Sequence, residues 1–151
     1  LLFRYIRAAC SQNTRLWKRS QIRKRVGEMS QKDENFFNVD DMEAGISREL
    51  AEGITTRIFP GQQAMISVVR VEPNIKGNIH SHEQEQWGYL ISGSATRIQD
   101  GEHIEVSAGD FWCSPGNVEH GIIGGPEGAV ILDIFAPPRP EYTKSGKGYG
   151  V

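Results

Sequence analysis

Short apolar and alternating runs dominate the chain from residue 45 onward, and each run is closed by Gly, Pro, Asn or Asp. Because successive side chains of an extended strand point to opposite faces, such runs favour β-structure over helix. The dipeptide Asp100-Gly101 between two alternating runs is a strong hairpin signal. The regular spacing of the breaks, about 8–12 residues, is typical of a sandwich or barrel. The pattern predicts strands at 46–51, 54–59, 63–72, 78–82, 86–92, 95–99, 103–107, 110–114, 119–124 and 129–135.

The first 28 residues follow a different pattern, in which apolar side chains recur near helical spacing between basic residues. This segment holds eight Lys or Arg and one acid, whereas residues 29–151 hold nine Lys or Arg and eighteen Asp or Glu. Three interpretations remain open: a targeting presequence, a helix that packs on the body or on a partner, or upstream sequence read through. The third is favoured, because Met29-Ser30-Gln31-Lys32 resembles a natural start.

Length and composition indicate one globular domain with an extension at each end. The chain has 151 residues, of which 38% are hydrophobic and 24% charged, and no run approaches the roughly 18 apolar residues of a membrane span. Cys10 and Cys113 lie in unlike contexts, which indicates a reducing compartment rather than a disulfide framework. The acidic body argues against nucleic-acid binding. We expect a basic extension over 1–40, a β-domain over 41–140 and a loose tail over 141–151, located in the cytoplasm with no membrane partner.

The run from His80 to Gln86 carries the most specific chemistry of the chain. If this segment is extended, His80, His82 and Gln86 point the same way. A further donor, His120, follows a turn-like segment far downstream. Converging imidazole and carboxamide groups would hold one divalent metal ion, with Zn, Ni, Fe and Mn all open. The alternative is that these are surface histidines in a polar loop that bind no metal. His103, the fourth histidine, serves as the control, because we expect it to face solvent.

These residues resemble the two motifs of the cupin family. His80-x-His82-x3-Gln86-x6-Gly93 is similar to the first motif, with Gln where the commonest version has Glu. Gly109-x5-Pro115-x4-His120 is similar to the second, with Asn117 where Gly is frequent. The resemblance implies an all-β, single-domain jelly roll that holds a divalent metal ion inside the barrel mouth, and it implies a homodimer. Four aromatic residues are expected in the core or at such a dimer surface: Trp87, Tyr89, Phe111 and Trp112.

A narrower resemblance concerns the KdgF-type cupins of pectin and alginate breakdown. It is carried by His80-Ser-His82 followed by Glu85-Gln86, and by the run Leu132-Asp-Ile-Phe-Ala-Pro-Pro-Arg139. That family uses three His and one Gln on its metal and turns 4,5-unsaturated uronates into open-chain keto sugars. An Asp, a Phe and an Arg line its pocket, and the resemblance places these roles on Asp133, Phe135 and Arg139.

Asp133 is also notable by itself, because it interrupts the apolar run 130–135. A carboxylate in such a run must be paired or have a raised pKa, and a raised pKa near a metal suits a general acid or base. The other interpretation is a buried Asp that holds a strand end. Phe135 shares the face of Asp133 and can stack on a sugar ring or pack in the core. Arg139 can clamp a substrate carboxylate or remain a solvated charge in a Pro-rich tail.

Three functions therefore remain open. The first is an enzyme that acts on a small oxygenated or sugar-acid substrate, because four neutral ligands leave a metal ion its full charge for Lewis-acid work. By the narrower resemblance, this enzyme would linearise 4,5-unsaturated uronates, with Asp133 moving protons. The second is a non-catalytic sugar- or effector-binding module. The third is a metal-dependent dioxygenase or a lyase on another substrate, and Gln86 in place of a carboxylate counts against a dioxygenase.

Overall fold

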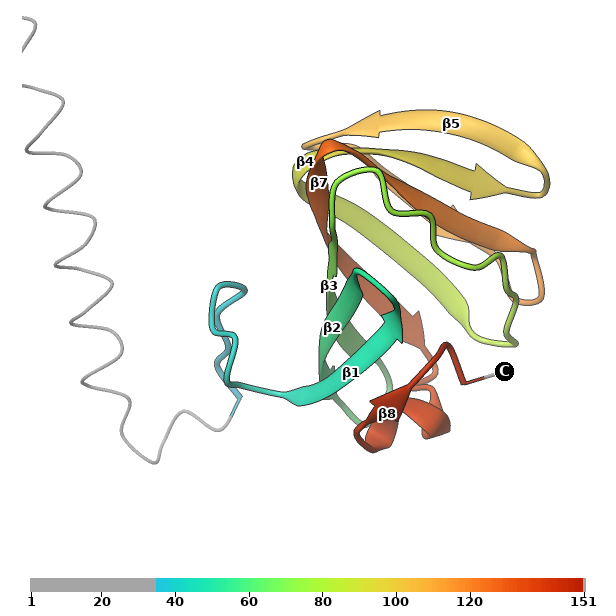
Figure 1. Ribbon diagram of the computed structural model, residues 1–151. Helices are drawn as coiled ribbons and strands as arrows, with labels where there is room; N and C mark the ends of the chain where they lie inside the picture. The colour runs from blue at the N-terminus through green and yellow to red at the C-terminus, as the bar shows by residue number, and fades with distance from the viewer. Residues whose placement is uncertain (1–34, 151) are drawn as a thin grey trace, which may run out of the picture. The chain divides into compact units, whose positions relative to one another are not determined.

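The computed structural model describes residues 35–150, and β-strands make up the body of the molecule (Figure 1). Within these residues there is no α-helix, and no helix is long and apolar enough to span a membrane. The all-β prediction is confirmed. The strands are β1 (Ile46–Ala51), β2 (Ile54–Pro60), β3 (Met65–Val71), β4 (Glu85–Gln99), β5 (Glu102–Ser107), β6 (Phe111–Ser114), β7 (His120–Ala136) and β8 (Gly146–Lys147), with a 3₁₀ turn, η1 (Pro140–Thr143), before the last strand.

The structure describes the start of the β-domain but not the segment before residue 35. Residues from Val39 onward form one compact unit, close to the predicted start at residue 41. The basic segment 1–28, and with it the three interpretations of its role, lies outside the described residues. The proposed extension 1–40 therefore stays a prediction.

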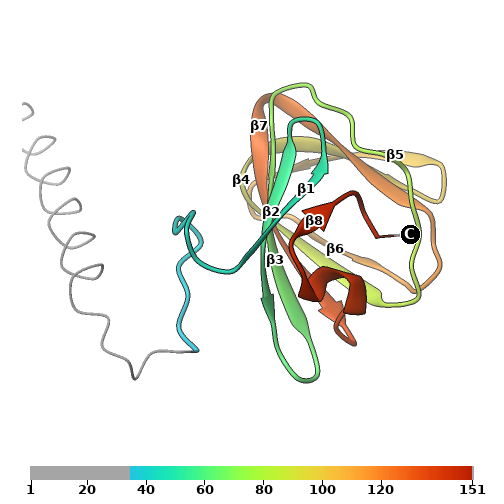
Figure 2. The ribbon, with the colours of Figure 1, turned by 60° about the horizontal axis from the view of Figure 1, so that its bottom comes forward.

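The strands join in the hydrogen-bonded order β5-β4-β7-β3-β2-β1-β8, and β6 pairs with β4 as well. All neighbouring pairs are antiparallel except β1 and β8, which are parallel. The long strands β4 and β7 pair with each other along most of their length and connect the two halves of the jelly roll. Figure 2 shows the strands curving round a common interior. Closure of this kind places the inward side chains of distant strands close together.

Two pairs of predicted strands are each one continuous strand in the structure. Register shifts interrupt the β4–β7 pairing between Leu90 and Ser92 and between Gly93 and Ala95, so the predicted strands 86–92 and 95–99 are one bent strand. The predicted strands 119–124 and 129–135 likewise merge into β7. Gly93 has a φ of 82°, and a Cβ there would lie 2.1 Å from the Gly128 carbonyl oxygen. The glycine of the first motif therefore permits this close approach.

Inward-facing side chains form the core, and most of them are apolar. Against this background, several polar side chains on β3, β4, β6 and β7 also point inward and are buried. Buried polar groups are costly unless they have partners. A cluster of them in one interior therefore indicates a binding or catalytic site rather than a region of core packing. They are Ser67, Gln86, Arg97, Ser114, His120 and Asp133.

The predicted loose tail over 141–151 is wrong for the residues described. Tyr142 and Tyr149 are buried, and β8 pairs with β1. The side chain of Arg48 on β1 donates hydrogen bonds to the carbonyl oxygens of Gly148 (2.7 Å), Lys147 (2.8 Å) and Glu141 (3.0 Å). Its guanidinium lies 5.1 Å from the centre of the Tyr142 ring. Two buried rings and one cation thus hold a segment whose Gly and Pro content suggested mobility.

Three of the four aromatic residues that we expected in the core or at a dimer surface lie on the outer face. Trp87 and Tyr89 on β4 and Phe111 on β6 are exposed, and Phe111 retains 70% of its accessible area. Trp112 instead points inward and is half-buried, packed against the core. The core alternative is therefore wrong for the first three residues, while the homodimer stays a prediction.

Replacement of Arg48 by Met should release the C-terminal segment. We expect Arg48→Met to lower the free energy of unfolding by about 2–4 kcal/mol, because it removes several charge-assisted hydrogen bonds to carbonyl oxygens. Urea denaturation measures this loss, and trypsin should cut the variant faster after Lys144 and Lys147. Arg57→Met on the outward face of β2 is the matched control. Equal stability and equal digestion of the two variants would contradict the assigned role of Arg48.

Candidate metal centre

A single antiparallel backbone pair brings the two histidine motifs together. The His80 N–H donates to the His120 carbonyl oxygen (3.0 Å), and the His120 N–H donates to that of His80 (2.9 Å). This is an isolated bridge, so the predicted strand 78–82 is reduced to one paired position. Paired residues in neighbouring strands carry their side chains on the same face. His80 and His120 therefore face the same space.

The turn before His120 holds His82 in place. The Asn117 N–H donates to the His82 carbonyl oxygen (2.7 Å), and Asn117 has a φ of 67°. Asparagine tolerates this left-handed conformation, which explains how it replaces the Gly that is frequent there. The neighbouring Gly116 lies so close to the loop that a Cβ would come within 2.3 Å of the Glu83 carbonyl oxygen. The two loops are thus matched in shape at the mouth of the barrel.

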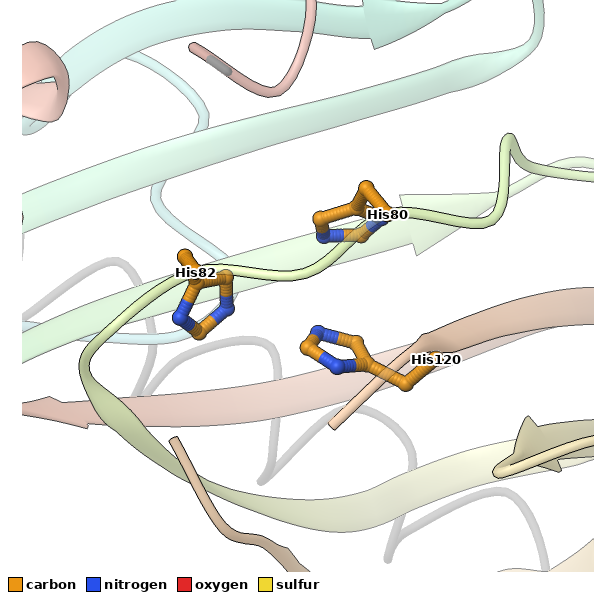
Figure 3. A group of neighbouring side chains, drawn as sticks. All are labelled: His80, His82 and His120. Carbon is orange, nitrogen blue, oxygen red and sulfur yellow. The ribbon is translucent and has the colours of Figure 1, made fainter. Parts of the chain in front are cut away.

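The three imidazole rings converge on one point (Figure 3). The centre of the His120 ring lies 4.5 Å from that of His80 and 4.9 Å from that of His82, and the latter two are 5.8 Å apart. One nitrogen from each ring lies within 4.8 Å of the others. The ring of His120 is buried, that of His82 nearly so, and that of His80 is half-buried. His103 is exposed on β5, as expected.

Backbone carbonyl groups orient two of the rings. The Nδ1 atoms of His80 and His120 lie 3.1 Å and 2.8 Å from the carbonyl oxygens of Asn78 and Val118. If Nδ1 carries the proton and donates in each pair, the Nε2 lone pair is left free. The Nε2 of His120 is indeed buried with no hydrogen-bond partner among the described residues. An unpartnered acceptor beside two other imidazoles fits a bound cation.

Gln86 completes the donor set. Its side chain is buried on β4, and Oε1 lies 3.1 Å from Nε2 of His82. Without a cation, this contact is a hydrogen bond in which the imidazole donates. Imidazole nitrogens and an amide oxygen are ligands that suit Zn, Ni, Fe or Mn, so these residues fit a divalent ion. The structure brings together all four residues that the sequence pointed to.

Burial keeps the rings neutral, as metal binding requires. Desolvation lowers the pKa of His80 to about 4 and that of His120 to about 3, and it also lowers the pKa of His82. Neighbouring positive charges act in the same direction, chiefly Arg97 on His120 and Arg139 on His82. Neutral imidazole is the form that ligates a cation, so protons compete little with a metal at neutral pH.

A cavity opens behind the rings and contains the predicted acid. Its lining contains His80, His120, Gln86 and Asp133. Asp133 points inward from β7 and is only 8% exposed. Burial raises the pKa of Asp133 to about 6, against the opposing effects of Arg97, the Gln86 amide and Arg139. The Oδ1 atom has no hydrogen-bond partner among residues 35–150. This carboxyl group can hold or release a proton close to neutral pH.

Phe135 and Arg139 occupy different surroundings. Phe135 lines the cavity, and its ring centre lies 5.4 Å from that of His82. Arg139 is fully buried, so the alternative of a solvated charge is wrong. Its Nε pairs with Glu141 (2.6 Å), its Nη2 donates to the Tyr149 carbonyl oxygen, and the guanidinium stacks on Tyr142. Nε and Nη2 are therefore used within the C-terminal segment, while Nη1 has no hydrogen-bond partner among the described residues. Arg139 does not line the cavity.

Sequence reasoning missed three residues of the cavity wall. Tyr149 stacks on His80 with ring centres 4.0 Å apart, although its Gly-rich surroundings suggested a mobile tail. Arg97 and Trp112 also line the cavity. The alternation of β4 could have shown that Arg97 lies on the inward face, since it is flanked by the outward-facing Thr96 and shares parity with the buried Ala95. Trp112 lies at a variable position of the second motif, whereas Arg97 and Tyr149 lie outside both motifs.

Comparison with known proteins supports the cupin fold. The cupin domain family matches residues 67–135. The chain is 29% identical over 96 residues to the pectin degradation protein KdgF of Dickeya dadantii, which covers 62% of this chain and 87% of that protein. It is 33% identical over 91 residues to the oxalate decarboxylase OxdC of Bacillus subtilis, covering 56% of this chain but 24% of that protein. An RmlC-like cupin from Shewanella frigidimarina has a similar structure, with a TM-score of 0.63 and 24% identity over 72% of this chain and 96% of its own.

The metal-free protein should lose stability as the pH falls from 7 to 5. The unfolded imidazoles, with a pKa near 6.5, take up protons that the buried rings of His80 and His120 accept only near pH 4 and below. Asp133 acts in the opposite direction below about pH 6, because its folded pKa is raised. Three histidines have lowered pKa values and one aspartate has a raised pKa, so the histidines dominate. The free energy of unfolding should therefore decrease as the pH is lowered.

Urea denaturation at several pH values measures this dependence. His120→Asn should flatten it, Asp133→Asn should steepen it, and His103→Asn, the exposed control, should leave it unchanged. A stability that does not change between pH 7 and 5, or that changes equally in the His103 and His120 variants, would contradict the burial of neutral rings.

Proposed function

Because this chain has the cupin fold, with three imidazole rings gathered beside a buried carboxyl group, we propose that it is a metal-dependent enzyme acting on a small oxygenated acid. The observation that carries the proposal is the convergence of His80, His82 and His120 on one point next to Asp133. A purely structural metal would not need an open cavity with an unpartnered carboxyl oxygen beside it.

The donor set indicates the kind of chemistry. A divalent ion held by neutral ligands supplies Lewis-acid polarisation of a substrate oxygen. His80, His82, His120 and Gln86 would hold it. Gln86 stands where a carboxylate ligand would reduce the charge of the ion, so this set favours polarisation over oxygen activation.

We propose 4,5-unsaturated uronates as the substrate class, linearised to open-chain keto sugars. The similarity to KdgF of Dickeya dadantii supports this class. The enol of the ring-opened sugar becomes a ketone when its hydroxyl loses a proton and the neighbouring carbon gains one. One group that both accepts and donates a proton balances this step, and Asp133, with a pKa of about 6, is suited to it.

The remaining predicted residues receive supporting roles. Phe135 lies in the cavity wall beside His82 and can stack on the sugar. Arg139 is proposed as a positioning residue rather than a direct clamp, because it fixes Tyr149, which in turn covers His80. Its stacking on Phe135, 5.4 Å from the ring centre, also restrains that ring.

A lyase that acts on another small acid is the second candidate, favoured by the similarity to oxalate decarboxylase. A dioxygenase would lose its activity without oxygen, so an anaerobic assay separates it from both. A binding module would retain uronate affinity and show no turnover.

We also propose a homodimer, as the family resemblance implies. The exposed side chains of Trp87, Tyr89 and Phe111 offer an apolar surface for a second copy. Sedimentation velocity should give twice the chain mass, and Phe111→Arg should shift it towards a single chain. A monomer at micromolar concentration would reject the dimer and leave the site unaffected.

Asp133→Asn tests the catalytic proposal. Zinc-loaded protein should accelerate the loss of absorbance of the conjugated double bond in unsaturated galacturonate. The variant should be slower by about 100- to 10,000-fold, because it cannot transfer the proton. Asp100→Asn in the β4–β5 turn is the matched control and should retain full activity.

No acceleration over the spontaneous reaction in metal-loaded protein would reject this substrate class. If Asp133→Asn weakens uronate binding but wild type shows no turnover, the binding-module function replaces the enzyme.

A further inference from the structure

Arg97 is a buried cation that forms no salt bridge with the described acids, although Asp133 lines the same cavity and the two charges interact. It points inward from β4 and is only 5% exposed. The ion pairs among the described residues are Arg139 with Glu141 and Lys147 with Glu49, and neither involves Arg97. A buried charge without a counter-charge is costly, so an unpaired guanidinium in a protein interior calls for a ligand or a structural reason.

The hydrogen bonds of Arg97 leave part of its capacity unused. Nη2 donates to the Ser114 hydroxyl oxygen (2.6 Å) and Nη1 to the Gly121 carbonyl oxygen (3.2 Å). Nε is buried and has no partner within residues 35–150. Both partners are neutral, so they fix the orientation of the guanidinium without compensating its charge.

Trp112 provides a second unused donor at the same wall. Its indole Nε1 is also buried without a partner in the described part of the chain. The Arg97 guanidinium lies 5.4 Å from the centre of the indole ring, and both residues line the cavity. Trp112 packs tightly over Gly88, where a Cβ would lie 2.3 Å from the ring. The two donors are therefore held rigidly on neighbouring strands.

A hydrogen-bonded chain supports this arrangement from behind. The Ser114 hydroxyl that accepts from Arg97 donates to Oε1 of Gln99 (2.6 Å), and Nε2 of Gln99 donates to the Cys113 carbonyl oxygen (2.9 Å). Donors that are ordered before a ligand arrives lose little entropy on binding. Such preorganisation is typical of a binding site rather than of a surface charge.

The ring of His120 lies within the electrostatic reach of Arg97. Arg97, His120 and Asp133 line the same cavity, and Nη1 of Arg97 donates to the carbonyl oxygen of Gly121, the residue that follows His120. The cation therefore faces the same cavity as the candidate metal ligands and the candidate acid. A ligand anion placed there would lie near Arg97 and the proposed metal position at once.

We propose that Arg97, together with the indole N–H of Trp112, forms an anion subsite that binds the carboxylate of an acidic ligand. This proposal rests on the proposed function, because the subsite would bind the carboxylate group of the proposed substrate in the same cavity. It assigns to Arg97 the carboxylate contact that the sequence analysis considered for Arg139, because Arg97 lines the cavity and Arg139 does not. Acids are bound more tightly than their neutral counterparts.

Equilibrium binding to zinc-loaded protein tests the subsite without turnover. Isothermal titration calorimetry compares D-galacturonate with its methyl ester, since neither carries a double bond that could react. Wild-type protein should prefer the acid by roughly 10- to 100-fold, the effect of a charge-assisted hydrogen-bonded contact. Arg97→Met should abolish the preference, and Arg57→Met, an outward-facing control on β2, should retain it.

Trp112→Phe is the second variant, because it removes the indole N–H and keeps an aromatic ring over Gly88. It should reduce the preference several-fold, and it decides the matter if Arg97→Met fails to fold, as judged by circular dichroism and zinc content. An unchanged preference in a folded Arg97→Met protein, or in Trp112→Phe when the former is unfolded, would overturn the subsite. Wild-type protein that binds acid and ester equally, or neither of them, would also overturn it.

The outcomes separate the subsite from the reaction. If unsaturated galacturonate is not converted but Arg97→Met loses the preference for the acid, the subsite stands and the proposed reaction fails. If conversion is observed and the preference survives in Arg97→Met, the reaction stands and the carboxylate is bound elsewhere.

Discussion

The reciprocal backbone pair between His80 and His120 is the constraint on which the rest of the site depends. It joins the loop that carries His80 and His82 to the first residue of β7, and the Asn117–His82 hydrogen bond continues the contact. This contact brings the three imidazole rings together, although no two of the histidines belong to the same strand. The turn conformation of Asn117 and the close approach of Gly116 to Glu83 are the local conditions for this pairing. The site is therefore a product of loop matching at the mouth of a rigid barrel.

Desolvation then gives the same residues their chemistry. Burial lowers the pKa of His80 and His120 and raises that of Asp133, so neutral ligands and a protonatable acid coexist near neutral pH. The interior also carries the positive charge of Arg97, which no acid within residues 35–150 pairs. A divalent ion would add to this charge, and an anionic substrate would offset it. Electrostatic balance thus favours acidic ligands over neutral ones of similar shape.

Much of the fold and the convergence of the candidate metal ligands could be predicted from the sequence, because both depend on short periodic patterns. Alternation located the strands, and the spacing of His80, His82, Gln86 and His120 indicated one site. Features that depend on tertiary contacts could not be predicted. The docking of Tyr142 and Tyr149 depends on Arg48, nearly 100 residues away in the sequence. The alternation of β4 could have placed Arg97 on the inward face, but its contacts in the cavity depend on closure of the barrel. The Pro-rich surroundings of Arg139 gave no sign that it is buried.

Anomalous diffraction from crystals of the zinc-loaded protein tests the central claim most directly. The account predicts one strong zinc peak per chain at the barrel mouth, with a nitrogen of His80, His82 and His120 each at about 2.0–2.1 Å from it. The amide oxygen of Gln86 should complete the set. A peak ligated by fewer than three of these imidazoles, or zinc bound only at exposed residues such as His103, would contradict the account.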